Sequence, residues 1–440
     1  MFAWLFAFAS LAFHLQLRVP FGVDIQTAAF AAACVVVWKP RLRGALLLLA
    51  ALQVVATFSE FPSNNTNRLV QCFVAATILV SGFRWSTTRA LLALELLVVY
   101  AWAFVHKLNW GYLDPSTSCA VQLTGNTPFA PIVPPPIGVM LIAATLAIEG
   151  SLAPLLAIPR TRLWGVRIGA AFHFVLALIG FVSFSATMIA LLSLYLAPDE
   201  VDAVRRTLTE WWRRRRASIL AVAVFAVAGF VAAMIAQDPS LASVNIGNAA
   251  ARWQVRVLYG VWMVGLVPLV GLWSPRVRRR PEPAVLFTPL SDLRTLPVAL
   301  WALPALMLVN GASPYLGWRT ETAFAMYSNL RTEGTLNNHL FLPSLPLAGY
   351  QRDLVQVVSS SDPVIADLAR AALPVPLIEL RRAVRQAAAG AGGVTVVYAS
   401  DGVVRTVSHA ERDPVLAQPL TFIERTLLRF RPIDSSRCDH

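Results

Sequence analysis

The residue whose type and position most suggest chemistry is Lys107, which follows an apolar run over residues 91–105. Only two of the 37 basic residues are lysines, Lys39 and Lys107, and all the others are arginines. Arginine stays protonated in proteins, whereas a desolvated lysine can lose its proton and act as a base. A lysine at this position therefore indicates a group that must be able to deprotonate. The alternative is a lysine that extends along the membrane interface to reach water.

Four other ionisable residues fall inside apolar runs, where an unpaired charge is costly: His14, Glu95, Glu149 and His173. Glu149 and His173 lie deepest within their runs, so they are candidates for lining an internal ligand cavity. The alternative for each of them is a structural hydrogen bond between helices.

Polar segments lie next to the apolar runs. Residues 61–68 contain Asn64 and Asn65, whose amides are suited to binding a polar ligand or Lys107, or to capping the next helix. Residues 317–340 are rich in hydrogen-bonding groups and follow the last apolar run. We expect this second segment to form a packed lid over the outer mouth of a helical bundle, where binding sites are common.

The composition is that of a membrane protein. The chain is 57% hydrophobic and 14% charged, with a mean hydropathy of +0.60, whereas soluble domains carry about 25% charged residues. The first apolar run lacks a basic start and an Ala-x-Ala cleavage pattern, so we expect a span there rather than a cleaved signal peptide. We predict about eleven spans, at residues 2–17, 25–38, 44–59, 68–83, 89–105, 136–158, 164–181, 183–197, 217–236, 253–273 and 295–311. The seventh and eighth can instead form one long bent segment.

The net charge of +13 comes mainly from arginines in short loops between the predicted spans. Arginine-rich loops alternate with arginine-poor loops. This is the pattern of a multi-pass protein of the cell membrane whose basic loops stay on the cytoplasmic side. The charge is therefore not the footprint of a nucleic-acid partner. With the N-terminus inside, the loop 106–135 and everything after residue 313 lie outside.

We predict two domains, a transmembrane helical bundle over residues 1–312 and an extracytoplasmic part over residues 313–440. Apolar runs shorten and charge rises in the last hundred or so residues. Residues 394–398 and 403–408 flank Asp401-Gly402, which is typical of a β-hairpin. The fold class is therefore an all-α polytopic membrane bundle with a lid and a small C-terminal α+β domain outside it.

Two of the four cysteines, Cys119 and Cys438, lie outside the predicted spans, and both face the oxidising side in this topology. Disulfides persist on that side, so we predict a bond between these two residues. It would tether the C-terminal tail to the loop that follows Lys107. The six histidines are scattered and no CxxC or HExxH spacing occurs, so we expect no metal site.

The stretch His106-Lys-Leu-Asn109-Trp110 resembles the membrane domain of the vitamin K-dependent gamma-carboxylase family, also called the horizontally transferred transmembrane (HTTM) domain. In that family an aromatic-rich span ends in a Lys-Leu-Asn/Asp pattern followed by an aromatic residue, and the lysine is the proposed base. Residues 114–119 and 326–331 look like the bacterial, HTTM-like branch. The resemblance covers roughly residues 1–340.

The resemblance implies a quinol-type lipid as the ligand. In the carboxylases the lysine deprotonates a quinol, whose oxygenation at the membrane then supplies a strong base. The resemblance implies Lys107 as the base. Our first hypothesis is therefore a membrane oxidoreductase or carboxylase-like enzyme. In it Asn64, Asn65 and His106 orient the quinol-type ligand, and the other ligand-binding residues are Asn109, Glu149 and His173.

The chain also departs from the family. The family's Asn-Asn-His segment resembles Asn64-Asn65-Thr66, with threonine in place of histidine. The chain also has no room for the large β-rich luminal region that holds the carboxylases' peptide substrate. We therefore expect the fold to carry over further than the reaction.

A second hypothesis is a non-catalytic membrane protein whose outer lid docks a lipid or an extracytoplasmic partner. The surroundings of Lys107 discriminate between the two hypotheses. A desolvated lysine inside the bundle favours the enzyme, and a lysine among water or headgroups favours the binding protein.

The predicted topology places the C-terminus outside the cell membrane. A reporter fused after His440 should therefore be active only if it works outside the cytoplasm. Activity of a reporter that functions only in the cytoplasm would contradict the topology.

Overall fold

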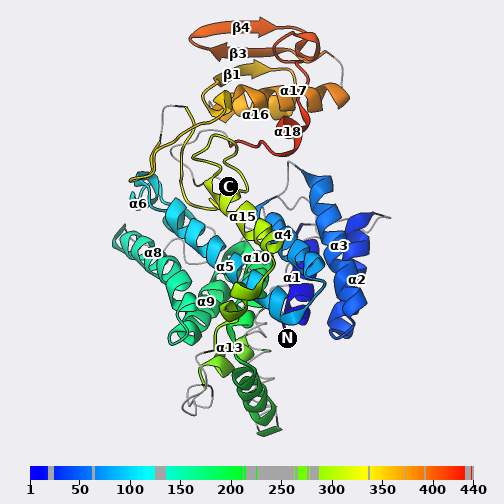
Figure 1. Cartoon of the computed structure of the whole chain (residues 1–440). Helices are drawn as coiled ribbons and strands as arrows, with labels where there is room; N and C mark the ends of the chain where they lie inside the picture. Colours follow the sequence, from blue (N-terminus) through cyan, green and yellow to red (C-terminus); the bar gives the residue numbers. More distant parts are fainter. Residues whose placement is uncertain are drawn as a thin grey trace.

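The computed structural model describes residues 1–17, 24–61, 65–123, 135–211, 213–214, 224, 262, 266–274, 277, 287–334, 337–371, 373–390, 393–431 and 438. Within these residues the protein consists of a bundle of apolar helices and a small α+β domain (Figure 1). The α+β domain lies beyond one end of the bundle, which we call the outer end. The first residue of the chain lies at the opposite, inner end (Figure 1).

The helices of the bundle follow the apolar runs of the sequence. In lipid each backbone N–H and C=O must be paired within the protein, and a helix pairs them along its whole length. Side chains cap two of the helix starts: Asp24 accepts from Thr27 N at 2.8 Å, and Asn65 accepts from Arg68 N at 2.9 Å. The helices are α1 (Phe2–Leu17), α2 (Ile25–Trp38), α3 (Arg43–Glu60), α4 (Thr66–Val80), α5 (Trp85–His106), α8 (Pro135–Ala157), α9 (Arg162–Leu176), α10 (Val182–Leu192) and α15 (Ala302–Ala312).

Four helical segments of the described chain are long and apolar enough to cross a membrane: Arg43–Glu60, Trp85–His106, Pro136–Ala157 and Arg162–Tyr195. Shorter apolar helices cover Phe2–Leu15, Ile25–Trp38, Thr66–Val80 and Val298–Ala312. The protein is thus mostly helical with candidate membrane spans, as predicted, while the count of eleven spans stays a prediction. The predicted spans at 217–236 and 253–273 lie mostly outside the described residues.

The segment Arg162–Tyr195 folds back on itself at Gly180. The φ of this residue is +119°, a value that side chains rarely adopt, so the turn requires glycine. Arg162 Nη1 donates to the carbonyl of Tyr195 at 2.6 Å, which shows that the two ends of the segment are neighbours. α9 and α10 are therefore two antiparallel helices rather than one long bent segment.

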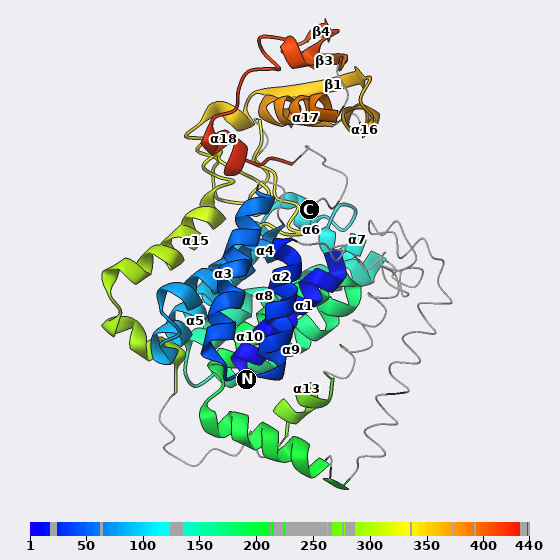
Figure 2. The same cartoon turned by 90° about the vertical axis from the view of Figure 1, so that its right-hand side faces the viewer.

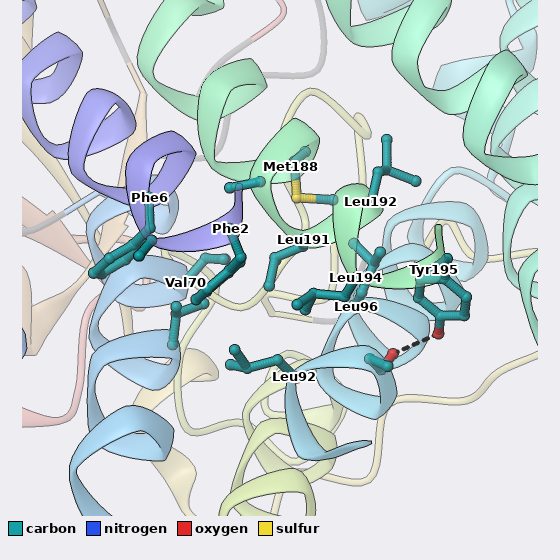
Figure 3. Packing of buried hydrophobic residues seen from close by; sticks show 14 of the residues in the cluster. Phe2, Phe6, Val70, Leu92, Leu96, Met188, Leu191, Leu192, Leu194 and Tyr195 are labelled. Carbon is teal, nitrogen blue, oxygen red and sulfur yellow. Dashed lines mark hydrogen bonds between the residues drawn. The ribbon is translucent and has the colours of Figure 1, made fainter. Parts of the chain in front are cut away.

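The core of the bundle lies where α1, α4, α5 and α10 meet (Figure 3). The Tyr195 hydroxyl donates to the carbonyl of Ala93 at 2.7 Å, so even this polar atom is satisfied. Close packing is what holds helices together in lipid, since burial from water is already complete there. The labelled core residues are Phe2, Phe6, Val70, Leu92, Leu96, Met188, Leu191, Leu192, Leu194 and Tyr195.

Arginines at the inner end hold the helices by binding to the carbonyls at their ends. Arg89 donates to the carbonyls of Leu194 and Leu196 at 2.7 and 2.6 Å. Arg162 forms a buried bidentate ion pair with Glu200, at 2.6 and 3.1 Å. These side chains therefore stabilise the fold, because a helix end leaves carbonyls without partners.

The α+β domain consists of a four-stranded antiparallel sheet and helices on one face (Figure 1). The strand order is β2-β1-β3-β4, and the turn between β3 and β4 contains Asp401 and Gly402, both with positive φ. The predicted hairpin around Asp-Gly is therefore confirmed. The elements are β1 (Leu354–Ser360), α16 (Pro363–Ala371), β2 (Pro374–Pro376), α17 (Leu377–Gly390), β3 (Val396–Ser400), β4 (Val403–Val407) and α18 (Phe422–Thr426).

α15 crosses α5 at Gly311, where the two helices touch. A Cβ atom at Gly311 would lie 2.2 Å from the ring of Trp102 on α5. Gly311→Ala should therefore push the helices apart and lower the free energy of unfolding by about 1–3 kcal/mol. Thermal unfolding of the full chain in detergent measures this change.

The matched control is Gly44→Ala in α3, where an added Cβ meets nothing within 4 Å. The control should unfold at the wild-type temperature or slightly above it, because alanine favours helix over glycine. Equal unfolding temperatures for the two variants would contradict the close crossing.

Candidate functional site

Lys107 lies at the C-terminal end of α5, and its ammonium group points into the protein. Nζ lies 2.8 Å from Oε2 of Glu149 on α8 and donates to the carbonyl of Ala103 at 3.3 Å. The side chains of Lys107 and Glu149 are 7% and 10% exposed. The two residues form a buried ion pair, so Lys107 does not extend to the membrane surface.

The pair depends on a close crossing of α5 and α8. Gly150, next to Glu149, lies against the ring of Phe104, and a Cβ atom there would be 2.7 Å from that ring. Glycine allows the two backbones to approach, and this approach brings the carboxylate of Glu149 within reach of the α5 terminus. The local sequence Glu149-Gly150 thus provides both the charge and the space for it.

A buried ion pair is a costly feature that structure alone does not require. Removing one partner of such a pair destabilises a protein by about 3–5 kcal/mol, whereas replacing both with apolar residues is often neutral. Ionisable groups at membrane depth are accordingly functional by default.

Two tyrosines lie near the pair. The ammonium of Lys107 lies 5.9 Å from the ring centroid of Tyr112. Burial, followed by the charge of Glu149, raises the pKa of Tyr112, so its phenol stays protonated. Tyr100 precedes Lys107 by two turns on the same face of α5, and its hydroxyl hydrogen-bonds Nε2 of His173 at 2.8 Å.

Sequence reasoning did not single out either tyrosine. The spacing of seven residues between Tyr100 and Lys107 was the available signal, because it places both side chains on one helical face. His173 was expected to line a ligand cavity. The structure instead gives it an interhelical hydrogen bond to Tyr100, which was the structural alternative.

His106, which was expected to act beside Lys107, binds a different helix. Its Nε2 donates to the carbonyl of Gly311 on α15 at 2.9 Å. Its ring stacks on Trp102, with 5.1 Å between centroids, and packs against Tyr315 at 5.6 Å. The structure therefore assigns His106 to the contact between α5 and α15, because the two adjacent residues point to different sides of the helix end.

Asn109, which was expected to bind the ligand, uses its whole amide group within the protein. Nδ2 donates to the carbonyls of His106 and Ser328 at 2.7 and 2.6 Å. Oδ1 accepts from Tyr112 N at 2.9 Å and from Nδ2 of Asn338 at 3.2 Å. With every donor and acceptor paired, Asn109 anchors the lid and has no group left for a ligand.

Of the two asparagines before α4, the structure describes one, Asn65. Asn65 caps α4 through its side-chain oxygen, which was the structural alternative for this residue. Asn64 lies outside the described residues. The polar groups beside Asn65 form a separate cluster, in which Arg68 binds Glu60, Gln26 and Gln53.

The lid, residues 317–340, packs on the chain that directly follows Lys107. Two short helices, α6 (Trp110–Leu113) and α7 (Cys119–Gln122), lie at the outer end of α5 and α8 (Figure 2). The backbone N–H of Trp110 donates to Asn338 O, and that of Leu340 donates to Leu108 O, both at 3.0 Å. Residues 338–340 thus line the chain that follows Lys107, as the predicted lid requires.

His339 fixes this contact through both ring nitrogens. Nε2 donates to the carbonyl of Val105 at 2.9 Å, and Nδ1 accepts from Leu342 N at 2.9 Å. Burial lowers the pKa of His339, which keeps the ring neutral and Nδ1 available as an acceptor. The end of α5 and the lid are therefore joined by a side chain that carries no charge.

The lid contains an unusual stretch of strained backbone. Thr322, Phe324, Tyr327 and Asn329 all have positive φ, between 52° and 61°. Residues with a Cβ adopt this region at about 1–2 kcal/mol each, and such residues cluster at ligand sites and switches. Sequence reasoning could not find this feature, because none of these positions carries the glycine that usually marks it.

The strained stretch is held from both sides. Asn329 accepts from Cys119 N at 2.7 Å and donates to Thr117 O at 2.8 Å. The ring of Tyr327 packs edge-on against Phe181, with 4.6 Å between centroids. The lid therefore rests on the turn between α9 and α10 as well as on the short helix that begins at Cys119.

Cys119 and Cys438 form the disulfide that the sequence predicts. Their Cα atoms are 4.9 Å apart, and 319 residues separate them in the chain. The backbone N–H of Cys438 also donates to Oε1 of Gln122 at 2.8 Å. The bond ties the last part of the chain to the start of α7, close to the loop that follows Lys107.

No group of three or more His, Cys, Asp or Glu residues suited to a metal ion occurs among the described residues. Comparisons with models of protein families, with curated proteins and with solved structures give no match. The chemistry of the site therefore has to be argued from its own geometry.

The disulfide should be present in the protein as isolated from membranes. Non-reducing mass spectrometry should show Cys119 linked to Cys438, with Cys34 and Cys72 free as internal controls. Cys438→Ser should lower the unfolding temperature, because cross-linking a long loop restricts the unfolded chain. Finding both thiols free would contradict the bond.

Proposed function

We propose that this protein is a multi-pass enzyme of the cell membrane that acts on a quinol-type lipid, with Lys107 as the base. The buried ion pair between Lys107 and Glu149 carries this proposal. The proposal includes about eleven spans and the external placement of the lid and the α+β domain. The resemblance of His106-Lys-Leu-Asn109-Trp110 to the HTTM domain of the gamma-carboxylases supports it.

The pair provides a base without a change of net charge. When the shared proton lies on Glu149, both groups are neutral, and Lys107 is a free amine. That amine takes the proton of a hydroxyl group, leaving an oxyanion beside a lysine ammonium, which is a new ion pair. The attraction between these charges is large in an apolar site. Glu149 then passes its own proton toward the outer end and receives the next one from Lys107.

The surrounding residues suit a flat, partly polar ligand. The Tyr112 phenol, which stays protonated, is a hydrogen-bond donor beside the pair. Ala103, one turn before Lys107 on α5, has a small side chain. We assign no role in the reaction to His106, whose Nε2 binds α15, or to Asn109, whose amide group binds the protein itself.

The alternative is a non-catalytic membrane protein whose outer lid docks a lipid or an extracytoplasmic partner. One observation favours it: large apolar side chains are exposed on the lid and beside it. They are Trp110 (67% exposed), Phe341 (63%), Leu345 (62%) and Leu347 (70%). In this case the ion pair is only a structural link between α5 and α8.

Replacing Lys107 tests the proposal. Lys107→Arg keeps the charge and the contact to Glu149 but removes the ability to give up a proton. It should therefore lower quinol turnover by about 100-fold or more, the usual contribution of a general base, while the unfolding temperature stays close to that of wild type. Glu149→Gln should lower turnover too, because the pair can no longer share a proton.

The matched control is Lys39→Arg at the other lysine, whose ammonium lies over the ring of Trp38 at 4.5 Å. This variant should keep full turnover in proteoliposomes. If Lys107→Arg also turns over quinol as fast as wild type, Lys107 is only an anchoring cation. If the loss of turnover in Lys107→Arg comes with a clear fall in its unfolding temperature, the pair is structural.

A further inference from the structure

A buried arginine in the lid has no partner for two of its nitrogens. Arg319 follows α15 and is 6% exposed. Its Nε and Nη2 atoms make no hydrogen bond to the rest of the described chain. Burial lowers the pKa of Arg319 to about 10, so the side chain still carries its charge at neutral pH. A buried guanidinium with unpaired N–H groups is costly, which calls for an explanation.

Nε and Nη2 lie on the same edge of the Arg319 guanidinium, and this edge can bind two oxygens of one anion at once. Nε and Nη2 present parallel N–H groups that match two oxygens of a carboxylate or a phosphate. Arg68 shows this use within the same protein, because its Nε and Nη2 bind the two carboxylate oxygens of Glu60 at 3.1 and 3.4 Å. Arg319 presents the same pair of donors with no carboxylate on them.

The acidic residues near Arg319 are already bound to other arginines. Glu379 on α17 lies 2.5 Å from Arg382 and 3.4 Å from Arg429. Glu321 lies 3.4 Å from Arg429. The positive charges of Arg382 and Arg429 repel the charge of Arg319 and contribute to lowering its pKa. The four guanidinium groups of this region thus outnumber its two carboxylates, so positive charge is in excess; they belong to Arg319, Arg382, Arg429 and Arg431.

This group of charges lies at the junction between the bundle and the α+β domain. The guanidinium of Arg319 lies 6.0 Å from the ring of Phe61, at the outer end of α3. The backbone N–H of Thr320 donates to the carbonyl of Arg429 at 3.0 Å, which joins the lid to the last segment of the domain. α15 leads from the membrane bundle into this junction (Figure 2). The site therefore lies where the bundle ends and the α+β domain begins, which is the headgroup region if the bundle spans the membrane as proposed.

We propose that Arg319 binds a phosphate group through Nε and Nη2, at the junction of α3, the lid and α17. A phosphate provides the two oxygens that match these atoms, and its negative charge balances the unpaired cation. The source is either the headgroup of a phospholipid in the outer leaflet or free phosphate. This site is separate from the Lys107–Glu149 pair, but the lipid source rests on the external placement of the lid that the proposed function includes.

Binding of two probes to the full chain, purified in detergent, tests the proposal. The probes are inorganic phosphate and short-chain phosphatidylglycerol, and the readouts are the unfolding temperature and native mass spectrometry. One or both probes should raise the unfolding temperature of wild type, while sodium chloride and a short-chain diacylglycerol should not. Arg319→Gln should weaken binding of the active probe by about 10-fold or more.

Two further variants keep the result interpretable. Arg319→Lys keeps the charge but loses the paired donors, so its affinity should fall between those of wild type and Arg319→Gln. Arg370→Gln removes an exposed arginine that pairs only with Asp367 in α16, and it should bind as wild type does.

The outcomes separate the two sources. A response to phosphatidylglycerol alone assigns the site to a lipid headgroup, and a response to both probes assigns it to phosphate in general. If neither probe stabilises wild type, the proposal is wrong. It is also wrong if Arg319→Gln raises the unfolding temperature while leaving the response to both probes unchanged, because Arg319 is then only an unpaired cation.

Discussion

The structure depends on one constraint: a polar group that leaves water must find its partner within the protein. In the bundle three buried or half-buried ion pairs follow this constraint. Arg162 and Glu200 pair at the inner end, Arg68 and Glu60 at the outer end, and Lys107 and Glu149 where α5 meets α8. Each pair joins segments that are distant in the sequence or separated by a turn. The charges therefore select the helix packing as strongly as the apolar core does.

The candidate site follows from the same constraint applied at a helix end. The last carbonyls of α5 have no partner within the helix. His339 takes one of them, at Val105, and Asn109 takes another, at His106. These bonds bring the lid down onto the residue that follows, Lys107, and shield its ammonium from water. The lid adopts a strained backbone to do so, and the disulfide to Cys438 holds it from the other side.

Much of this arrangement could be predicted from residue types and periods, and some could not. The helices follow apolar runs, the hairpin follows Asp401-Gly402, and the two cysteines follow from the topology, because each is a local or compositional signal. The partner of each buried polar side chain could not be predicted in this way. Lys107 binds Glu149 rather than an asparagine because α8 crosses α5 at Gly150, a contact between segments far apart in the chain. His106 turns to α15 for the same reason. Such crossings depend on packing, which the sequence pattern does not contain.

The buried cations at the two ends of the bundle differ in how many partners they have. At the inner end Arg162 donates to both oxygens of Glu200 and also to the carbonyls of Tyr195 and Phe287. A guanidinium held by four acceptors cannot release a proton and suits a fixed joint. At the outer end Lys107 has one carboxylate contact and one longer bond to a carbonyl. The ammonium of Lys107 is therefore held by fewer contacts than the guanidinium of Arg162. The protein thus combines a densely bonded ion pair at the inner end with a sparsely bonded one at the outer end, and the proposal for Lys107 rests on this second pair.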